Sequence, residues 1–156
     1  NLSEEYLYEV FGGNGFMGYF YKYNVSGENI IIGRVGALCG NIRYINEEKW
    51  ITDNALILNL INLSKTLYSY VSYVLECANL NALSVSNAQP LITGTKVMNI
   101  SIAIPPLSEQ KQIIDYLDKQ TAKIDQAIAL KTAHIEKLKE YKSVLINDAV
   151  TGKVRV

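Results

Sequence analysis

Residues 108–150 contain neither glycine nor proline and are rich in alanine, leucine, lysine, glutamine and glutamate. These residue types favour helix, so the sequence predicts one continuous helix, a rod on the order of 60 Å long at about 1.5 Å per residue. The proline pair at 105–106 marks where this helix cannot yet have begun, and Gly152 marks its end. Ser108 is the predicted N-cap, and Glu109 follows in the first turn, where the helix dipole favours a negative charge. Such a helix exceeds what a domain of this size needs for its own core, which predicts a spacer or a dimerisation arm.

Apolar residues recur along this helix at alternating steps of three and four residues, in a single heptad register. A seam of this kind is what one helix buries against another in a coiled coil. The register lacks an apolar side chain at Thr121, Lys131 and Lys142, and Ala149 continues it near the end. The predicted helix–helix interface consists of Ile114, Leu117, Ile124, Ile128, Ile135, Leu138 and Leu145.

The first 107 residues predict a small mixed domain. The chain is 49% hydrophobic and 19% charged, as expected of a globular protein rather than a disordered one. Short apolar runs separated by turn residues predict strands, and Asp53 and Asn54 are interpreted as turn-forming residues. The expected strands are residues 30–32, 41–45, 50–58 and 97–104, and the expected packed helix is residues 64–80. Together with the long helix, this pattern predicts an α+β fold.

A glycine-rich turn lies near the start of the chain. Gly13, Gly15 and Gly18 match the spacing of the dinucleotide-binding fingerprint, but that motif requires a strand before it and a helix after it. The residues that follow, 19–23, form an aromatic run with strand propensity and no helical periodicity. Two interpretations remain open, a plain glycine loop between strands or a loop that approaches a nucleic-acid backbone. Neither requires a cofactor, and none is expected.

The start of the long helix carries a resemblance to a known family. The residues concerned are IPPLSEQKQII at 104–114, Leu117, Ile124–Asp125, Leu145–Ile146 and TGKV at 151–154. This pattern resembles the conserved region of the specificity subunit of Type I restriction–modification systems, in which a PPLxEQ sequence follows a target-recognition domain and opens a long helix. The segment from IIIGRVGALCGNI to WITDNALIL, residues 30–58, is similar to the recognition-domain core of the same family.

The resemblance implies a non-catalytic subunit of a larger enzyme complex. In the family, two recognition domains each read one half of a bipartite double-stranded DNA site, and two long helices pack antiparallel and set the spacing between the half-sites. The subunit recruits methyltransferase (M) and restriction (R) subunits, which supply the S-adenosylmethionine and ATP chemistry. By this resemblance, residues 1–107 are one target-recognition domain, expected to lack its N-terminal part, residues 108–150 are the conserved helix, and residues 151–156 are a tail.

The heptad seam has no predicted partner within the chain. A chain with half of the family's plan is therefore expected to pair its helix with a second copy, or with the other half of a specificity subunit. The alternative is a coiled-coil protein–protein interaction module without DNA binding. The formal net charge of zero favours that alternative, because stand-alone nucleic-acid binders are strongly basic. The resemblance disfavours it.

Candidate DNA-contacting residues follow from side-chain chemistry and loop placement. Arg34, on a glycine-rich link, suits a phosphate or a guanine, and the alternative is a structural arginine. The amide and hydroxyl side chains between Asn79 and Thr95 suit base edges, and the alternative is an ordinary polar loop. The predicted set is Tyr19, Tyr21, Lys22, Arg34, Asn87, Gln89 and Lys96.

No combination of residues predicts catalysis or a metal site. His134 is the lone histidine and lies beside the heptad seam, and with two distant cysteines it cannot build a zinc site. Cys39 and Cys77 have no metal-type spacing and are interpreted as reduced thiols of a cytoplasmic protein. No apolar run of the sequence reaches the length of a membrane span, so no membrane association is expected.

Overall fold

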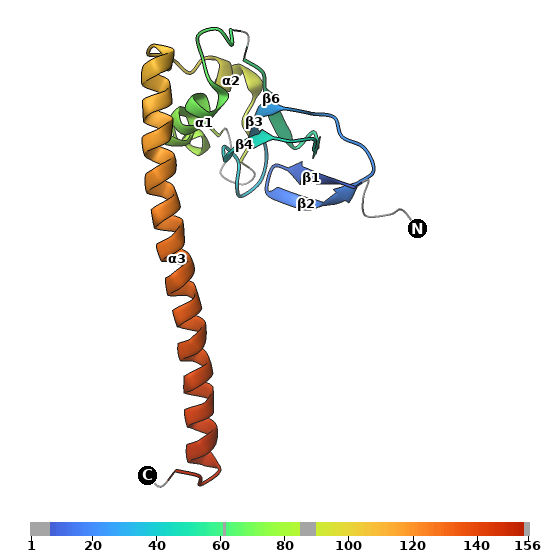
Figure 1. Ribbon diagram of the computed structural model, residues 1–156. Coiled ribbons are helices and arrows are strands. Elements are labelled where there is room, and N and C mark those ends of the chain that lie inside the picture. The colour runs from blue at the N-terminus through green and yellow to red at the C-terminus, as the bar shows by residue number, and fades with distance from the viewer. Residues whose placement is uncertain (1–6, 61, 85–89, 155–156) are drawn as a thin grey trace. The chain divides into compact units, whose positions relative to one another are not determined.

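The computed structural model describes residues 7–60, 62–84 and 90–154 (Figure 1). The chain divides into two compact units, residues 1–113 and residues 114–156. Strands combined with helices, among them a long one near the C-terminus, confirm the expected α+β class. In chain order the elements are β1 (Tyr8–Gly12), β2 (Gly15–Phe20), β3 (Glu28–Gly33), β4 (Ile42–Asn46), β5 (Trp50–Ile51), β6 (Ala55–Leu58), α1 (Tyr68–Cys77), the 3-10 helix η2 (Leu80–Leu83), α2 (Gly94–Met98) and α3 (Leu107–Val150).

Among the described residues, the strands form two three-stranded sheets. In the first, with the order β2-β1-β5, β1 and β2 form an antiparallel hairpin and β5 runs parallel to β1. In the second, with the order β4-β3-β6, both outer strands run antiparallel to β3. The hairpin turn is the glycine-rich turn of the sequence, and the element after β2 is another strand. The turn is therefore not a dinucleotide-binding fingerprint, which would open a helix.

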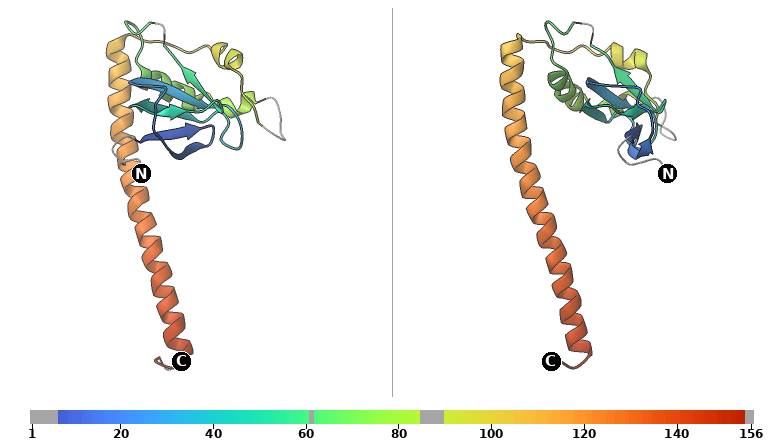
Figure 2. Two further views of the ribbon diagram at one scale, coloured as in Figure 1. Left: turned by 90° about the vertical axis from the view of Figure 1, so that its right-hand side faces the viewer. Right: turned by 45° about the vertical axis from the view of Figure 1, so that its right-hand side comes forward.

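The hydrophobic core covers both faces of the β4-β3-β6 sheet. Because side chains alternate along a strand, Ile30 and Ile32 point to one face of β3 and Ile31 to the other. Helix α1 lies beside the sheet and contacts β3 and β4 (Figure 2). It contributes Val71 and Leu75, which are buried. The cluster around Ile31 consists of Val25, Ile45, Ile51, Ala55 and the partly buried Phe11. Because Phe11 and Ile51 belong to the first sheet, this cluster joins the two sheets.

Two predicted elements differ in extent from the structure. Residues 50–58, predicted as one strand, are two strands that join different sheets, with β5 beside β1 and β6 beside β3. The turn between them contains Asp53 and Asn54, which confirms their interpretation as turn-forming residues. The helix predicted over residues 64–80 is shorter and spans only Tyr68–Cys77.

The predicted strand over residues 97–104, starting beside Lys96, is wrong. Gly94–Met98 forms the short helix α2, and residues 100–106 have no regular secondary structure. Val97 is buried, and with Ile100 and Ile102 it lines an apolar groove. The groove's other walls include Leu58, Leu60, Val71 and Leu75. The side chains that the sequence assigned to a strand are thus carried by α2 and by the irregular segment after it. They reach the groove without the segment joining a sheet.

Helix α3 begins one residue earlier than predicted. Its first residue is Leu107, so Ser108 lies within the first turn and is not the N-cap. The carbonyl oxygen of Pro106 accepts hydrogen bonds from the backbone N–H groups of Glu109 and Gln110, at 2.9 and 3.0 Å. Proline can open a helix in this way because its own missing N–H would have had no helical acceptor.

The first turn of α3 is fixed to the first unit by the side chain of Gln110, which is 0% exposed. Its Oε1 accepts a hydrogen bond from the backbone N–H of Leu67 at 3.0 Å. Its Nε2 donates to the carbonyl oxygens of Lys65 at 2.7 Å and Pro105 at 2.8 Å. We call these three bonds the Gln110 clamp. The glutamine of the PPLSEQ sequence is thus a buried connector between the helix start and the loop before α1.

The second unit consists mainly of the rest of α3. The seam residues Ile124, Ile128, Ile135, Leu138 and Leu145 are each 48–57% exposed. His134 is also exposed. Gly152, with φ of 75°, lies two residues beyond the end of the helix, which confirms its predicted role as the stop signal.

Candidate nucleic-acid interface

The outer strand of the first sheet, β2, and the three residues that follow it carry several exposed aromatic and apolar side chains. Tyr19 is 62% exposed and Phe16 is 53% exposed, and their rings lie 5.3 Å apart. This group consists of Phe16, Met17, Tyr19, Tyr21 and Tyr23, and we call it the aromatic edge. Exposed aromatic faces in a group are unusual on a monomer surface and suit stacking against another flat group.

A cation, Lys22, lies between two residues of the aromatic edge. The ammonium of Lys22 lies 5.2 Å from the centre of the Tyr21 ring, which is cation–π distance. Both side chains are exposed. Tyr19, Tyr21 and Lys22 of the predicted set thus lie exposed on one short segment, and of these Lys22 contacts Tyr21.

The glycine-rich link after β3 packs directly on the hairpin turn, backbone against backbone. A side-chain carbon at Gly13 would lie 2.6 Å from the carbonyl oxygen of Asn54 and 2.8 Å from that of Val35. At Gly33 it would lie 2.5 Å from the carbonyl oxygen of Gly13. Only glycine allows these approaches, so the turn and the link form one platform, which we call the glycine platform.

Arg34 lies on this glycine platform with its backbone held and its side chain exposed. Its backbone N–H donates a hydrogen bond to the backbone carbonyl oxygen of Asn54 at 3.0 Å, and its carbonyl oxygen accepts one from the N–H of Ile92 at 2.9 Å. The same carbonyl accepts from the buried thiol of Cys39 at 3.2 Å, and burial raises the pKa of that thiol. The exposed side chain of Arg34 is therefore carried by a backbone that is held on both sides.

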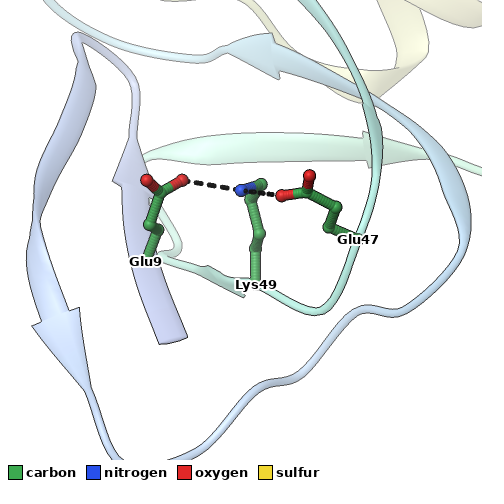
Figure 3. Close-up of polar contacts among 3 residues, drawn as sticks. All are labelled: Glu9, Glu47 and Lys49. Carbon is green, nitrogen blue, oxygen red and sulfur yellow. Dashed lines mark hydrogen bonds and ion pairs between the residues drawn. The ribbon is translucent and has the colours of Figure 1, made fainter. Parts of the chain in front are cut away.

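A buried lysine, Lys49, forms ion pairs with two more exposed carboxylates. Lys49 is 8% exposed, and its ammonium contacts Glu9 at 2.6 Å and Glu47 at 2.7 Å (Figure 3). Burial alone would lower the pKa of Lys49, but the hydrogen bonds and charges of Glu47 and Glu9 outweigh it and raise the pKa. The hydrogen bond from Lys49 likewise lowers the pKa of Glu47. Because its charge is already compensated, Lys49 is a structural cation that links β1 to the segment before β5.

Arg43 on β4 is a half-buried arginine that the sequence did not single out. Its guanidinium carbon lies 4.6 Å from the centre of the Phe11 ring. A side-chain carbon at Gly15 would lie 3.3 Å from one of its nitrogens, so this glycine leaves the guanidinium its space. The alternation of side chains along β4 does place Arg43 on the same face as Ile45. The sequence alone could not tell that this face of β4 meets the hairpin, because that depends on the tertiary packing.

Tyr44, next to Arg43, points to the other face of β4 and donates a hydrogen bond to Glu28 Oε1 at 2.7 Å. Burial, together with the hydrogen bond and charge of Glu28, raises the pKa of Tyr44 to about 12.

The folded protein is expected to lose stability as the pH rises above about 10, and replacing Tyr44 by phenylalanine should remove part of that loss. An unfolded tyrosine ionises near pH 10, whereas folded Tyr44 stays protonated up to about pH 12. The stabilisation from this difference is complete below about pH 10 and is lost as the pH rises through about 12. Urea denaturation of wild type and Tyr44→Phe between about pH 8 and 12 should therefore give stabilities that converge at the alkaline end. A constant difference across that range would contradict the assignment.

The remaining predicted residues lie apart from the aromatic edge in the structure or outside its described part. Asn87 and Gln89 lie outside the described residues. Lys96 is half-buried on α2, and its ammonium donates a hydrogen bond to the carbonyl oxygen of Leu83. That bond ties α2 to η2, an interaction that the sequence pattern did not indicate.

Two further findings concern the described residues alone. In that part of the chain, no group of three or more histidine, cysteine or acidic side chains is arranged to hold a metal ion. Every helix there is too short or too polar to cross a lipid bilayer.

Comparison with known proteins gives a consistent result. Residues 2–140 match the sequence model of a family described as "Type I restriction modification DNA specificity domain". The chain is 33% identical over 120 residues to the Type I restriction enzyme EcoprrI specificity subunit of Escherichia coli, covering 75% of this chain and 29% of that protein. It is 26% identical over 126 residues to a putative type I specificity subunit of Mycoplasma pneumoniae, covering 74% of this chain and 41% of that protein. The chain thus spans less than half the length of either relative.

A solved structure also resembles the fold. The crystal structure of a Type I restriction–modification S subunit from M. genitalium superposes with a TM-score of 0.68 at 20% sequence identity. The match covers 81% of this chain and 36% of that chain. At this identity the likeness concerns the fold, and it agrees with the α+β assignment and the long helix.

Proposed function

The chain belongs to the family of Type I restriction–modification DNA specificity domains, and from this we propose that it reads one half of a bipartite DNA site within a specificity subunit. In this proposal residues 1–107 are the target-recognition domain and residues 108–150 are the helix that sets the spacing to the other half. The methyltransferase and restriction subunits of the complex act on DNA in the cytoplasm, and this chain directs them without catalysing a step. The observation that carries the proposal is the family match over residues 2–140.

The proposed DNA contacts come from the aromatic edge and the glycine platform. Tyr19 and Tyr21 offer exposed ring faces, and Lys22 and Arg34 offer exposed cations. Lysine and arginine suit phosphate contacts, and arginine also suits the guanine edge in the major groove. Asn87, Gln89 and Lys96 remain proposed contacts on the grounds of their side-chain chemistry alone.

The proposed partner of the long helix is a second copy of the chain or the other half of a specificity subunit. In support, the seam residues of α3 in the second unit are about half-exposed, and their spacing fits a coiled coil. A pair of such chains would present two recognition domains and read a symmetric site. The paired helices would also be the part of the subunit that the methyltransferase subunits bind.

Replacing Lys22 by glutamine is expected to make DNA binding less dependent on salt. Each phosphate contact contributes about 0.9 to the slope of the logarithm of affinity against the logarithm of salt concentration. Lys22→Gln should therefore reduce the magnitude of that slope by about 0.9 and weaken binding similarly for all sequences. Fluorescence anisotropy with a labelled pool of random-sequence duplexes, between about 50 and 200 mM salt, measures the slope.

Lys65→Gln is the matched control, because Lys65 is exposed and lies on the loop before α1. It removes the same charge and should leave the slope unchanged. A wild-type chain with no affinity for duplex DNA, or with an affinity that salt does not affect, would refute the proposal. Either result would favour the coiled-coil interaction module.

A further inference from the structure

Arg43 is a half-buried cation with an unusual set of neighbours. Its guanidinium lies on the face of the Phe11 ring, 4.6 Å from guanidinium carbon to ring centre. In the described part of the chain, no carboxylate lies within ion-pair distance of it, whereas Lys49, whose ammonium is 5.4 Å from the centre of the same ring, has two. Arginine has five N–H donors in a planar fork, and stacking on an aromatic ring satisfies none of them.

The carboxylates of the neighbouring strands are engaged elsewhere. Glu9 and Glu47 bind Lys49, and Glu28 accepts the hydrogen bond of Tyr44. Among the described residues, the buried ammonium of Lys49 thus has two carboxylate partners, whereas the half-buried guanidinium of Arg43 has none. Because an uncompensated charge that is partly removed from water is costly, the fork of Arg43 is suited to an acceptor that comes from outside the chain.

The position of Arg43 connects it to the aromatic edge. The ring of Phe11, on which the guanidinium lies, contacts the ring of Phe16 at 5.9 Å, and Phe16 contacts Tyr19 at 5.3 Å. Phe16 and Tyr19 are both more than half-exposed. One continuous path of ring contacts thus leads from the guanidinium to the exposed aromatic edge.

From this geometry we propose that Arg43 is a DNA contact of the recognition domain, and that its fork binds a pair of adjacent acceptors on the nucleic acid. This proposal rests on the proposed function and adds a residue that the sequence did not indicate. Two parts of DNA offer such a pair, the O6 and N7 atoms of guanine in the major groove and the oxygens of a phosphate. The Phe11 ring holds the guanidinium plane in place before binding, which lowers the entropic cost of a bidentate contact.

The test compares wild type, Arg43→Lys, Arg43→Gln and the control Lys65→Gln, all in the full chain. A pool of random-sequence duplexes is selected on each protein and sequenced, and the affinity for one duplex selected on wild type is measured against salt. Thermal unfolding of each variant separates lost folding from lost contact. Arg43→Lys keeps the charge and loses the fork.

We expect Arg43→Gln to bind the selected duplex at least about tenfold more weakly, as loss of one bidentate base contact predicts. A guanine contact gives relaxed selection at one base pair for both Arg43 variants, with the salt slope little changed in Arg43→Lys. A phosphate contact leaves the selected sequences the same as for wild type and reduces the salt slope of Arg43→Gln by about 0.9. In that case Arg43→Lys, which keeps the charge, should restore the wild-type affinity and slope. If wild type binds DNA and folded Arg43→Gln matches it in affinity, selection and slope, the proposal for Arg43 fails while the proposed function stands. If wild type binds no duplex, both fail.

Discussion

Replacing Gln110 by alanine is expected to lower the free energy of unfolding of the first unit by roughly 3–5 kcal/mol. The change removes the partner of three partly buried hydrogen bonds of the Gln110 clamp, namely those of the N–H of Leu67 and the carbonyls of Lys65 and Pro105. Each buried group left unsatisfied costs about 1–3 kcal/mol. Urea denaturation followed by the fluorescence of Trp50, the single tryptophan, measures the loss within the first unit.

Two further variants sharpen this experiment. Gln112→Ala removes the same side chain from an exposed position on the same helix, and it should change the stability by less than about 0.5 kcal/mol. Gln110→Leu keeps most of the volume but none of the hydrogen bonds, so it should be nearly as destabilising as Gln110→Ala. If Gln110→Ala were as mild as Gln112→Ala, the clamp would not hold the helix start to the domain.

The double substitution Ile128→Asp/Ile135→Asp is expected to convert a dimer of the chain into a monomer. The two residues lie one heptad apart on the exposed seam, so pairing would bury both new carboxylates against a partner helix. A buried unpaired charge costs several kcal/mol, which is roughly a thousandfold or more in the dissociation constant. Light scattering at about micromolar concentration gives the mass of each protein in solution.

The control is Gln126→Asp/Ala133→Asp, which adds the same two charges one heptad apart on the opposite side of the helix. Both positions are exposed and should stay in water in the paired state, so the control should remain a dimer. A monomeric wild type would contradict pairing with a second copy. It would leave the other half of a specificity subunit, on a different chain, as the partner to test.

The long helix was predictable because its signals are local. Residues 108–150 lack glycine and proline, and the heptad spacing needs no knowledge of the rest of the fold. Gln110 shows the limit of such signals. By sequence it is one more polar residue in the first turn of a helix, and its burial depends on Lys65 and Leu67, which lie 45 and 43 positions earlier.

The errors in the first unit have the same origin. Residues 97–104 are apolar enough for a strand, but the side chains of Val97, Ile100 and Ile102 line a groove beside β6 and the segment does not join the sheet. Residues 50–58 read as one strand, yet the turn at Asp53 and Asn54 sends the two halves to different sheets. In each case tertiary packing decides between conformations that the local sequence permits.

The candidate interface was predictable in part for a similar reason. The aromatic run and Arg34 stand out by residue type, and the structure places their side chains on the surface. Arg43 did not stand out, because a single arginine in an apolar strand is ambiguous until its face is known. Its stacking on Phe11 follows from how the hairpin meets β4, which no short segment encodes.

The glycine platform has a consequence for how this surface could change its side chains. The hairpin turn and the link after β3 meet through main-chain atoms at Gly13 and Gly33, where any side chain would collide with a carbonyl oxygen. The contact therefore does not depend on the identity of neighbouring side chains such as Arg34, which point to solvent. Mutation can exchange those side chains while the scaffold that displays them keeps its shape. A library randomised at the exposed positions of the link, with its glycines retained, is thus a rational starting point for redesigning the surface.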